Sequence, residues 1–161
     1  MTIFFRLCLL SLTLLSLNNS VSANADSDIS FIVAASKPPI GVIFEVIENN
    51  EKALELALQK INKYSKQLKK TIPSIKLAVV SHGTEQFALL TKNKRQYAST
   101  HNKVLSLMDN NVPVHVCGTH ASWYSLSKKD FPDYVDVTVA GPKKIKEYQR
   151  LGYALIKIEL D

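Results

Sequence analysis

The stretch IKLAVVSHG, residues 75–83, gives the clearest indication of the fold, because a run of mostly apolar and β-branched residues ends there in a histidine and a glycine. Such a run is typical of a buried strand. Two later stretches end in a similar way: VPVHVCG at residues 112–118 and YVDVTVAG at residues 134–141. The repeated pattern predicts several buried strands, each followed at once by a glycine.

Helices are expected between these strands. The segment 51–68 has its apolar residues at helical spacing and lysines on the opposite side; the apolar set is Leu54, Ala57, Leu58, Ile61 and Leu68. Further helices are expected over residues 96–108 and 142–151, with short ones at TEQFALL and after Cys117, and strands also over residues 40–47 and 153–160. Strands that alternate with helices predict a three-layer α/β/α fold around a mostly parallel, five-stranded sheet.

The N-terminal segment has the layout of a secretory signal peptide. Residues 1–25 contain one charged side chain, Arg6, then a short apolar run, then small residues at Ala23 and Ala25. The apolar run is shorter than the ~20 residues that span a bilayer. We therefore expect cleavage after Ala23 or Ala25, a periplasmic or secreted protein, and no stable membrane anchor.

Three parts of the chain are expected. Residues 1–25 are the signal peptide, residues 26–39 form an N-terminal arm that ends in two prolines, and residues 40–161 form one domain. Loss of the signal peptide removes Arg6 and Cys8, so the formal net charge falls from +6 to +5 and one cysteine remains. The mature chain therefore cannot form an internal disulfide. Its lysines are scattered and do not alternate with aromatic residues, so no nucleic-acid partner is expected.

A site is expected where the strands end. Ligand sites of open α/β sheets form outside the carboxyl ends of the strands. His82, Cys117 and Ala140 each precede a strand-end glycine, namely Gly83, Gly118 and Gly141. If the strands are parallel, a histidine and the only mature cysteine lie on that one rim.

Cys117 has a physical route to reactivity. The thiolate is the reactive form, and backbone N–H groups of the following GTHAS segment would stabilise it. His82 or His120 could serve as hydrogen-bond donor or proton relay. Gly83, Gly118 and Thr119 are the candidate ligand-binding positions. An inert buried cysteine is the alternative, and these residues alone leave the two readings balanced.

Other chemistries have weaker support in the sequence. The spacing His115-x-Cys117-x-x-His120 is not a recognised zinc-site spacing and no second cysteine supports it, so no metal is expected. No G-x-G-x-x-G, P-loop or G-x-S-x-G motif occurs, and no cofactor is expected. His115 is expected to be a hydrogen-bonded core or interface histidine and His101 a solvated one. Trp123 and Tyr124 are expected to pack, with a pocket or oligomer contact as the alternative.

Several of these motifs, in their order and spacing, resemble the DsrE/DsrF-like family and most of all its exported, single-domain branch. The resemblance covers residues 40–158 and rests on GVIFEV, IKLAVVSHG, NVPVHVCGTH and VDVTVAGPKKIKEYQRLGYALIKI. It implies a flavodoxin-like α/β domain that assembles as a homotrimer or hexamer. Relatives in cytoplasmic sulfur-relay systems carry sulfur as a persulfide on a cysteine, which Cys117 matches. Gly118 matches the glycine after it, and His82 with Gly83 matches the ending of the second strand.

The resemblance leads to one principal functional hypothesis and two alternatives. The principal hypothesis is an exported sulfur carrier or sulfurtransferase-type protein with Cys117 as the persulfide site. Its partners would be a sulfur donor or acceptor protein or a small thiol. The first alternative is a non-enzymatic module of the same fold that binds a small ligand or a partner. The second is a metal-binding protein.

Overall fold

The computed structural model describes residues 24–160 and contains one parallel sheet within them. The strands are β1 (Gly41–Val46), β2 (Lys76–Ser81), β3 (Val114–Cys117), β4 (Asp136–Thr138) and β5 (Tyr153–Ile158). Their order across the sheet is β4-β3-β2-β1-β5, and every neighbouring pair is parallel. The strands predicted from the sequence are confirmed. The expected signal peptide, apart from residues 24 and 25, lies outside the described residues.

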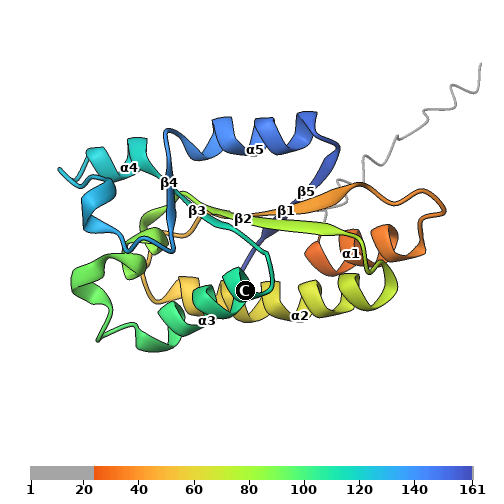
Figure 1. The fold of residues 1–161 in the computed structure, drawn as a ribbon, viewed down its shortest axis with the longest axis horizontal. Coiled ribbons are helices and arrows are strands. Elements are labelled where there is room, and N and C mark those ends of the chain that lie inside the picture. The colour runs from red at the N-terminus through yellow and green to blue at the C-terminus, as the bar shows by residue number, and fades with distance from the viewer. Residues whose placement is uncertain (1–23, 161) are drawn as a thin grey trace, which may run out of the picture.

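Helices lie on both faces of the sheet (Figure 1). They are α1 (Ala25–Ala34), α2 (Ala53–Thr71), α3 (Ala98–Asp109), α4 (Gly118–Ser122) and α5 (Gly141–Arg150), with 3₁₀ helices η1 (Thr84–Leu89), η2 (Thr91–Asn93) and η3 (Lys128–Asp130). Helices α1, α2 and α3 lie on one side and α5 on the other. The prediction of a three-layer, flavodoxin-like α/β fold is confirmed. Flavodoxin itself has the strand order 2-1-3-4-5, so the likeness lies in the layers and the parallel sheet.

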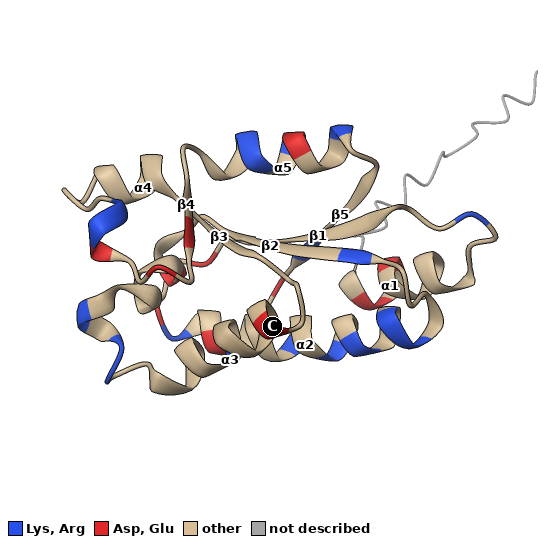
Figure 2. Cartoon of the chain, viewed as in Figure 1, with Lys and Arg blue, Asp and Glu red and all other residues tan. Residues whose placement is uncertain are grey.

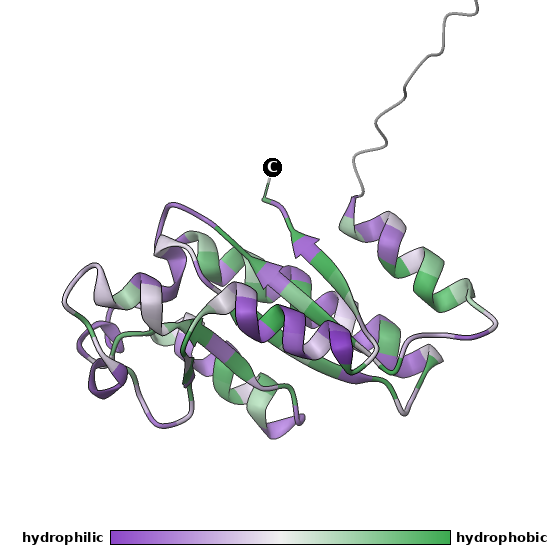
Figure 3. Cartoon of the chain, turned by 90° about the horizontal axis from the view of Figure 1, so that it is seen from above, coloured by the Kyte–Doolittle hydropathy of each residue, from purple (hydrophilic) through white to green (hydrophobic). Residues whose placement is uncertain are grey.

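Successive residues of each strand face opposite layers, which divides the core in two. Val42, Phe44 and Val46 of β1 belong to the large cluster under α1, α2 and α3. Ile43, between them, packs with Ile145 of α5 in a smaller cluster. The strands carry mainly hydrophobic residues, whereas the helices carry both kinds (Figure 3). Glu45 and His115 also alternate with residues of the large cluster, so these two polar side chains lie on the α5 face of the sheet.

The segment expected as an N-terminal arm contains a helix that belongs to the core. Asn24 caps α1 by accepting a hydrogen bond from the backbone N–H of Asp26 at 3.1 Å. Ile29 and Ile32 are buried, and α1 contacts both α2 and β5. The helix is thus part of the folded domain. No helix within residues 24–160 is long and apolar enough to cross a membrane.

Most lysines of α2 are exposed and spaced along the helix, as a solvated face requires (Figure 2). The histidine of α3 differs from its expectation. His101 is 1% exposed, donates from Nε2 to the Ala88 carbonyl at 3.1 Å and accepts at Nδ1 from the Tyr134 hydroxyl. The prediction that it is solvated is wrong, because it lies on the same buried face of α3 as Val104.

Candidate functional site

A pocket of about 650 Å³ opens at the carboxyl ends of β1, β2 and β3. Its lining residues come from the segments that follow those strands and from the start of α5: Ile47, Glu48, Asn49, His82, Gly83, Thr84, Cys117, Thr119, His120, Trp123, Ala140 and Pro142. The structure therefore brings five of the six candidate site residues to one pocket. The sixth, Gly118, does not line it.

Cys117 is the last residue of β3 and the N-cap of α4. Its side chain is buried, with 5% of the residue exposed, yet it borders the pocket. Its backbone N–H donates to Oε1 of Gln86 at 2.7 Å, and its Sγ accepts the backbone N–H of His120 at 3.4 Å. The sulfur therefore lies between the pocket and an N–H donor that would stabilise negative charge on it.

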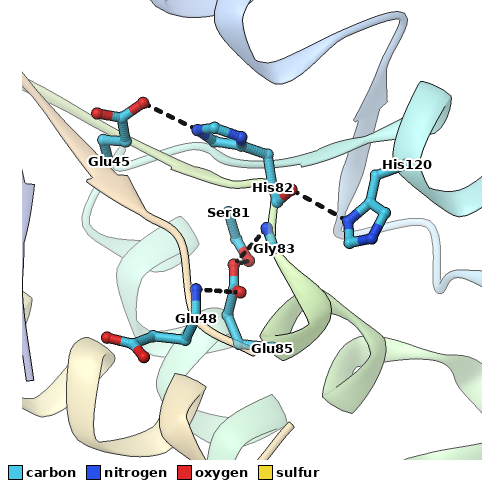
Figure 4. A network of polar contacts seen from close by, with 7 residues as sticks. All are labelled: Glu45, Glu48, Ser81, His82, Gly83, Glu85 and His120. Atoms are coloured by element: carbon cyan, nitrogen blue, oxygen red, sulfur yellow. Dashed lines mark hydrogen bonds and ion pairs between the residues drawn. The ribbon is translucent and has the colours of Figure 1, made fainter. Parts of the chain in front are cut away.

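His120 lies on α4, one turn after the cysteine. Its ring packs against Phe87, Trp123 and Tyr124, with centroid distances of 5.3, 5.2 and 5.5 Å. Nδ1 lies 3.1 Å from Nε2 of Gln86 and 3.1 Å from the carbonyl oxygen of His82. The second of these contacts is drawn in Figure 4.

His82 contributes to the pocket through two different groups. Its ring Nε2 pairs with Oε1 of Glu45 at 2.9 Å, and both side chains are largely buried, at 12% and 10% exposure. Its backbone carbonyl points the other way, toward His120 (Figure 4). The start of α5 packs directly on it: a Cβ at Gly141 would lie 2.6 Å from the Cβ of His82. The hydrogen bond of the His82 ring thus runs to Glu45, while its carbonyl serves the pocket.

A buried carboxylate joins the loops that follow β1 and β2. Glu85 is fully buried; its Oε1 accepts from the Ser81 hydroxyl at 2.6 Å and the Gly83 N–H at 3.0 Å, and its Oε2 accepts from the Glu48 N–H at 2.7 Å (Figure 4). A carboxylate with three donors satisfies backbone groups that the strand ends leave unpaired. Glu85 therefore fixes the edge of the pocket.

Sequence reasoning assigned TEQFALL to a short helix and missed the roles of Glu85 and Gln86. Both are fully buried polar residues. The available signal is their position, since they begin the first turn after the SHG ending of β2. Two consecutive long polar side chains beside a strand-end glycine are candidates for closing the loop rather than for facing solvent.

The strand-end glycines permit close approach of neighbouring groups. A Cβ at Gly83 would lie 2.4 Å from the Glu48 carbonyl oxygen, and one at Gly118 would lie 2.8 Å from the Thr138 carbonyl oxygen. Within residues 24–160 a positive φ occurs at one glycine, Gly152, which ends α5 and has φ 89°. Gly83 and Gly118 are therefore required by packing and not by backbone conformation.

A second polar network lies deeper on the α5 face. His115 is 6% exposed, and its Nδ1 donates to Asp136 at 2.6 Å. Its Nε2 is 2.9 Å from the Tyr148 hydroxyl. Burial lowers the pKa of His115, and the Asp136 carboxylate opposes that shift only in part. The expectation of a hydrogen-bonded core histidine is confirmed, and His115 does not line the pocket.

Two aromatic residues, Trp123 and Tyr124, follow the cysteine at the edge of the pocket. Trp123 is 74% exposed and Tyr124 is 56% exposed. Both rings pack against His120, as expected, and Trp123 also lines the pocket, which was the alternative. Within residues 24–160 no three His, Cys, Asp or Glu side chains are arranged to hold a metal ion. The pocket brings one thiol, Cys117, together with two histidines, His82 and His120.

Comparisons with known proteins bear on the fold. No family model matches the chain, and no curated protein matches it. Among solved structures, it is similar to MTH1491, a protein of unknown function from Methanobacterium thermoautotrophicum, with a TM-score of 0.58 and 21% identity. The match covers 72% of this chain and 96% of that chain. At this identity the likeness shows the α/β fold and nothing of the activity.

Proposed function

We propose that this chain is an exported sulfur carrier of the DsrE type, in which Cys117 accepts sulfane sulfur as a persulfide. One observation carries the proposal. The only cysteine within residues 24–160 borders the pocket at the carboxyl end of β3, with its Sγ hydrogen-bonded by the His120 N–H. Besides this geometry, the proposal rests on the resemblance of the strand-end motifs to that family.

The proposed transfer uses two displacement steps at sulfur. The Cys117 thiolate attacks the outer sulfur of a donor persulfide, a new S–S bond forms, and the donor's S–S bond breaks to release the donor thiol as a thiolate. An acceptor thiolate then attacks the outer sulfur on Cys117 and restores the original thiolate. Sulfane sulfur moves in each step without net oxidation, so no further redox partner is required.

The residues around Cys117 have separate roles in this scheme. The backbone N–H of His120 stabilises the Cys117 thiolate before sulfur arrives and again when the sulfur leaves, since charge-assisted hydrogen bonds are the stronger kind. Thr119 holds the turn after β3, because its hydroxyl donates to the Val139 carbonyl at 2.7 Å. Gly83 lets the loop after β1 approach the pocket edge. The His120 ring borders the cavity that would receive the donor.

Intact-mass measurement tests the proposal directly. The mature protein, incubated with a small-molecule persulfide or polysulfide, is expected to gain the mass of one sulfur atom, and a reducing thiol is expected to remove it. Cys117→Ser is expected to gain nothing. A chain that gains no sulfur while native Cys117 reacts with an alkylating agent would contradict the proposal.

A binding module of the same fold is the second candidate, and the burial of Cys117 favours it. The sulfur belongs to a residue that is 5% exposed, whereas Ile47 and Trp123 at the pocket edge are 55% and 74% exposed. On this candidate a ligand would contact the exposed apolar side chains, and Cys117→Ser would retain full binding. Slow alkylation of Cys117 that requires unfolding would favour this candidate over the carrier.

We further propose export and assembly as a homotrimer or homohexamer. The support for assembly is the resemblance, together with three exposed apolar side chains near the pocket, Ile47, Trp123 and Val139. Light scattering on the mature protein is expected to give three or six times the subunit mass. A monomer at micromolar concentration would contradict this part of the proposal.

A further inference from the structure

We propose that Gln86 is a positioning residue that sets which nitrogen of His120 carries the proton, so that the pocket is offered an N–H donor and not a base. Gln86 is fully buried, so its amide has no solvent to satisfy it. Two contacts define its orientation, one to the backbone of Cys117 and one to the ring of His120. This inference rests on the proposed function for its chemical consequence, although its geometry does not depend on it.

The orientation of the amide follows from its first contact. A backbone N–H can only donate, so the Gln86 atom 2.7 Å from the Cys117 nitrogen must be the oxygen, Oε1. The other end of the amide is then the NH₂ group, which can only donate. This group is the atom that lies 3.1 Å from Nδ1 of His120. A neutral His120 that accepts from Gln86 at Nδ1 therefore carries its proton on Nε2.

The second contact of the His120 ring favours the other position of the proton. The His82 carbonyl oxygen, also 3.1 Å from Nδ1, accepts a hydrogen bond only if Nδ1 carries a proton. Gln86 and the His82 carbonyl thus compete for one nitrogen in opposite proton states. Gln86 favours the neutral ring with Nε2–H, and the carbonyl favours the Nδ1–H form or the charged ring. The ring needs no large movement to pass between them.

The position of the proton matters for the chemistry at Nε2, the other nitrogen of the His120 ring. Within residues 24–160, Nε2 of His120 has no hydrogen-bond partner, and His120 lines the pocket. With the proton on Nε2, the ring can donate a hydrogen bond to an anionic sulfur in the pocket. With the proton on Nδ1, Nε2 would be a base instead. The titratable side chains that line the pocket with His120 are Glu48, His82 and Cys117, and the ring of Tyr124 packs against His120. The NH₂ group of Gln86 can donate to the neutral His120 ring but not to the charged one.

Nitrogen NMR of the imidazole ring tests the assignment without any sulfur donor. In the ¹⁵N-labelled mature protein, at a pH where the ring is neutral, the His120 signals, assigned by their loss in His120→Gln, are expected to show protonated Nε2 and bare Nδ1. Gln86→Glu is expected to reverse them, because a carboxylate accepts both from the Cys117 N–H and from an Nδ1–H. Gln67→Glu, at an exposed position of α2, is the matched control and is expected to leave the pattern unchanged.

The outcomes separate this inference from the proposed function. A wild-type ring protonated on Nδ1, or a folded Gln86→Glu variant that keeps Nε2–H, would overturn the inference. If Gln86→Glu does not fold, Gln86→Leu replaces it and is expected to shift the ring toward Nδ1–H on the His82 carbonyl. Sulfur loading of Cys117 is expected to slow about tenfold or more in the reversed variant. Failure of wild-type loading with the expected tautomer would reject the sulfur carrier and leave the role of Gln86 standing.

Discussion

At the scale of single residues, the pocket edge depends on two buried polar side chains that close loops. Glu85 accepts three hydrogen bonds that hold the loops after β1 and β2 together. Gln86, beside it, holds the backbone of Cys117. Buried polar groups stabilise a structure only when each has its partners, so both positions tolerate little change.

Glu85→Gln is expected to lower the free energy of unfolding by about 1–3 kcal/mol. The amide keeps the shape of the side chain but turns one acceptor into a donor, which then faces a hydroxyl or a backbone N–H. Urea denaturation measures the change. Glu159→Gln, at an exposed position, is the control and is expected to have little effect. Equal stability of both variants would show that the three-donor arrangement contributes nothing.

At the scale of elements, the segment expected as an N-terminal arm contains a helix, α1, that packs into the main core. Ile29 of α1 is fully buried in the main core, whereas Phe31 of the same helix is 78% exposed. The two side chains lie on opposite sides of a helix that contacts α2 and β5. Residues 25–34 thus stabilise the domain although they precede its first strand.

Ile29→Ala is expected to lower the free energy of unfolding by about 2–5 kcal/mol, because it leaves a cavity in the core. Phe31→Ala, on the exposed side of α1, is expected to change it by less than about 0.5 kcal/mol. Chemical denaturation of the mature protein compares the two variants. Similar small losses in both would mean that α1 does not pack on the domain in solution.

The elements themselves were predictable, because hydrophobic periodicity is a local property. The apolar face of α2 and the buried runs of β1, β2 and β3 can be read directly from their residues. The polar contacts could not be read this way. His101 looks like a surface histidine until α3 is packed, and the burial of Gln86 depends on α4, which follows it by some thirty residues. Cys117 was found because it ends a strand, which is again a local signal.

At the scale of the whole molecule, two buried histidines link stability to pH. Burial lowers the pKa of His101, with Lys94 acting in the same direction, and burial is also the main cause of the lowered pKa of His115. The unfolded chain takes up protons at the ordinary histidine pKa of about 6.5, while these two sites in the folded state take them up only at lower pH. The unfolded state then binds more protons, so acidification destabilises the fold.

The free energy of unfolding is therefore expected to fall as the pH drops through about 6.5. Carboxylates whose pKa is lowered, such as Glu55 and Glu147, act below about pH 4.5 and do not contribute in this range. His101→Gln, whose amide can still donate to Ala88, is expected to weaken the pH dependence by removing one of the two groups. Denaturation at several pH values measures it. An unchanged slope in the variant would contradict the assignment.

The strand order has a consequence for how the chain is made. The first strand, β1, lies between β2 and β5, so its second neighbour is the last strand of the sequence. A ribosome at work on this chain cannot complete the sheet until residues 153–158 have emerged, at a rate of about 5–20 residues per second. Pairing between such distant segments is also slow to nucleate. The second neighbour of β1 therefore arrives only at the end of translation, which makes the complete sheet a late product of synthesis.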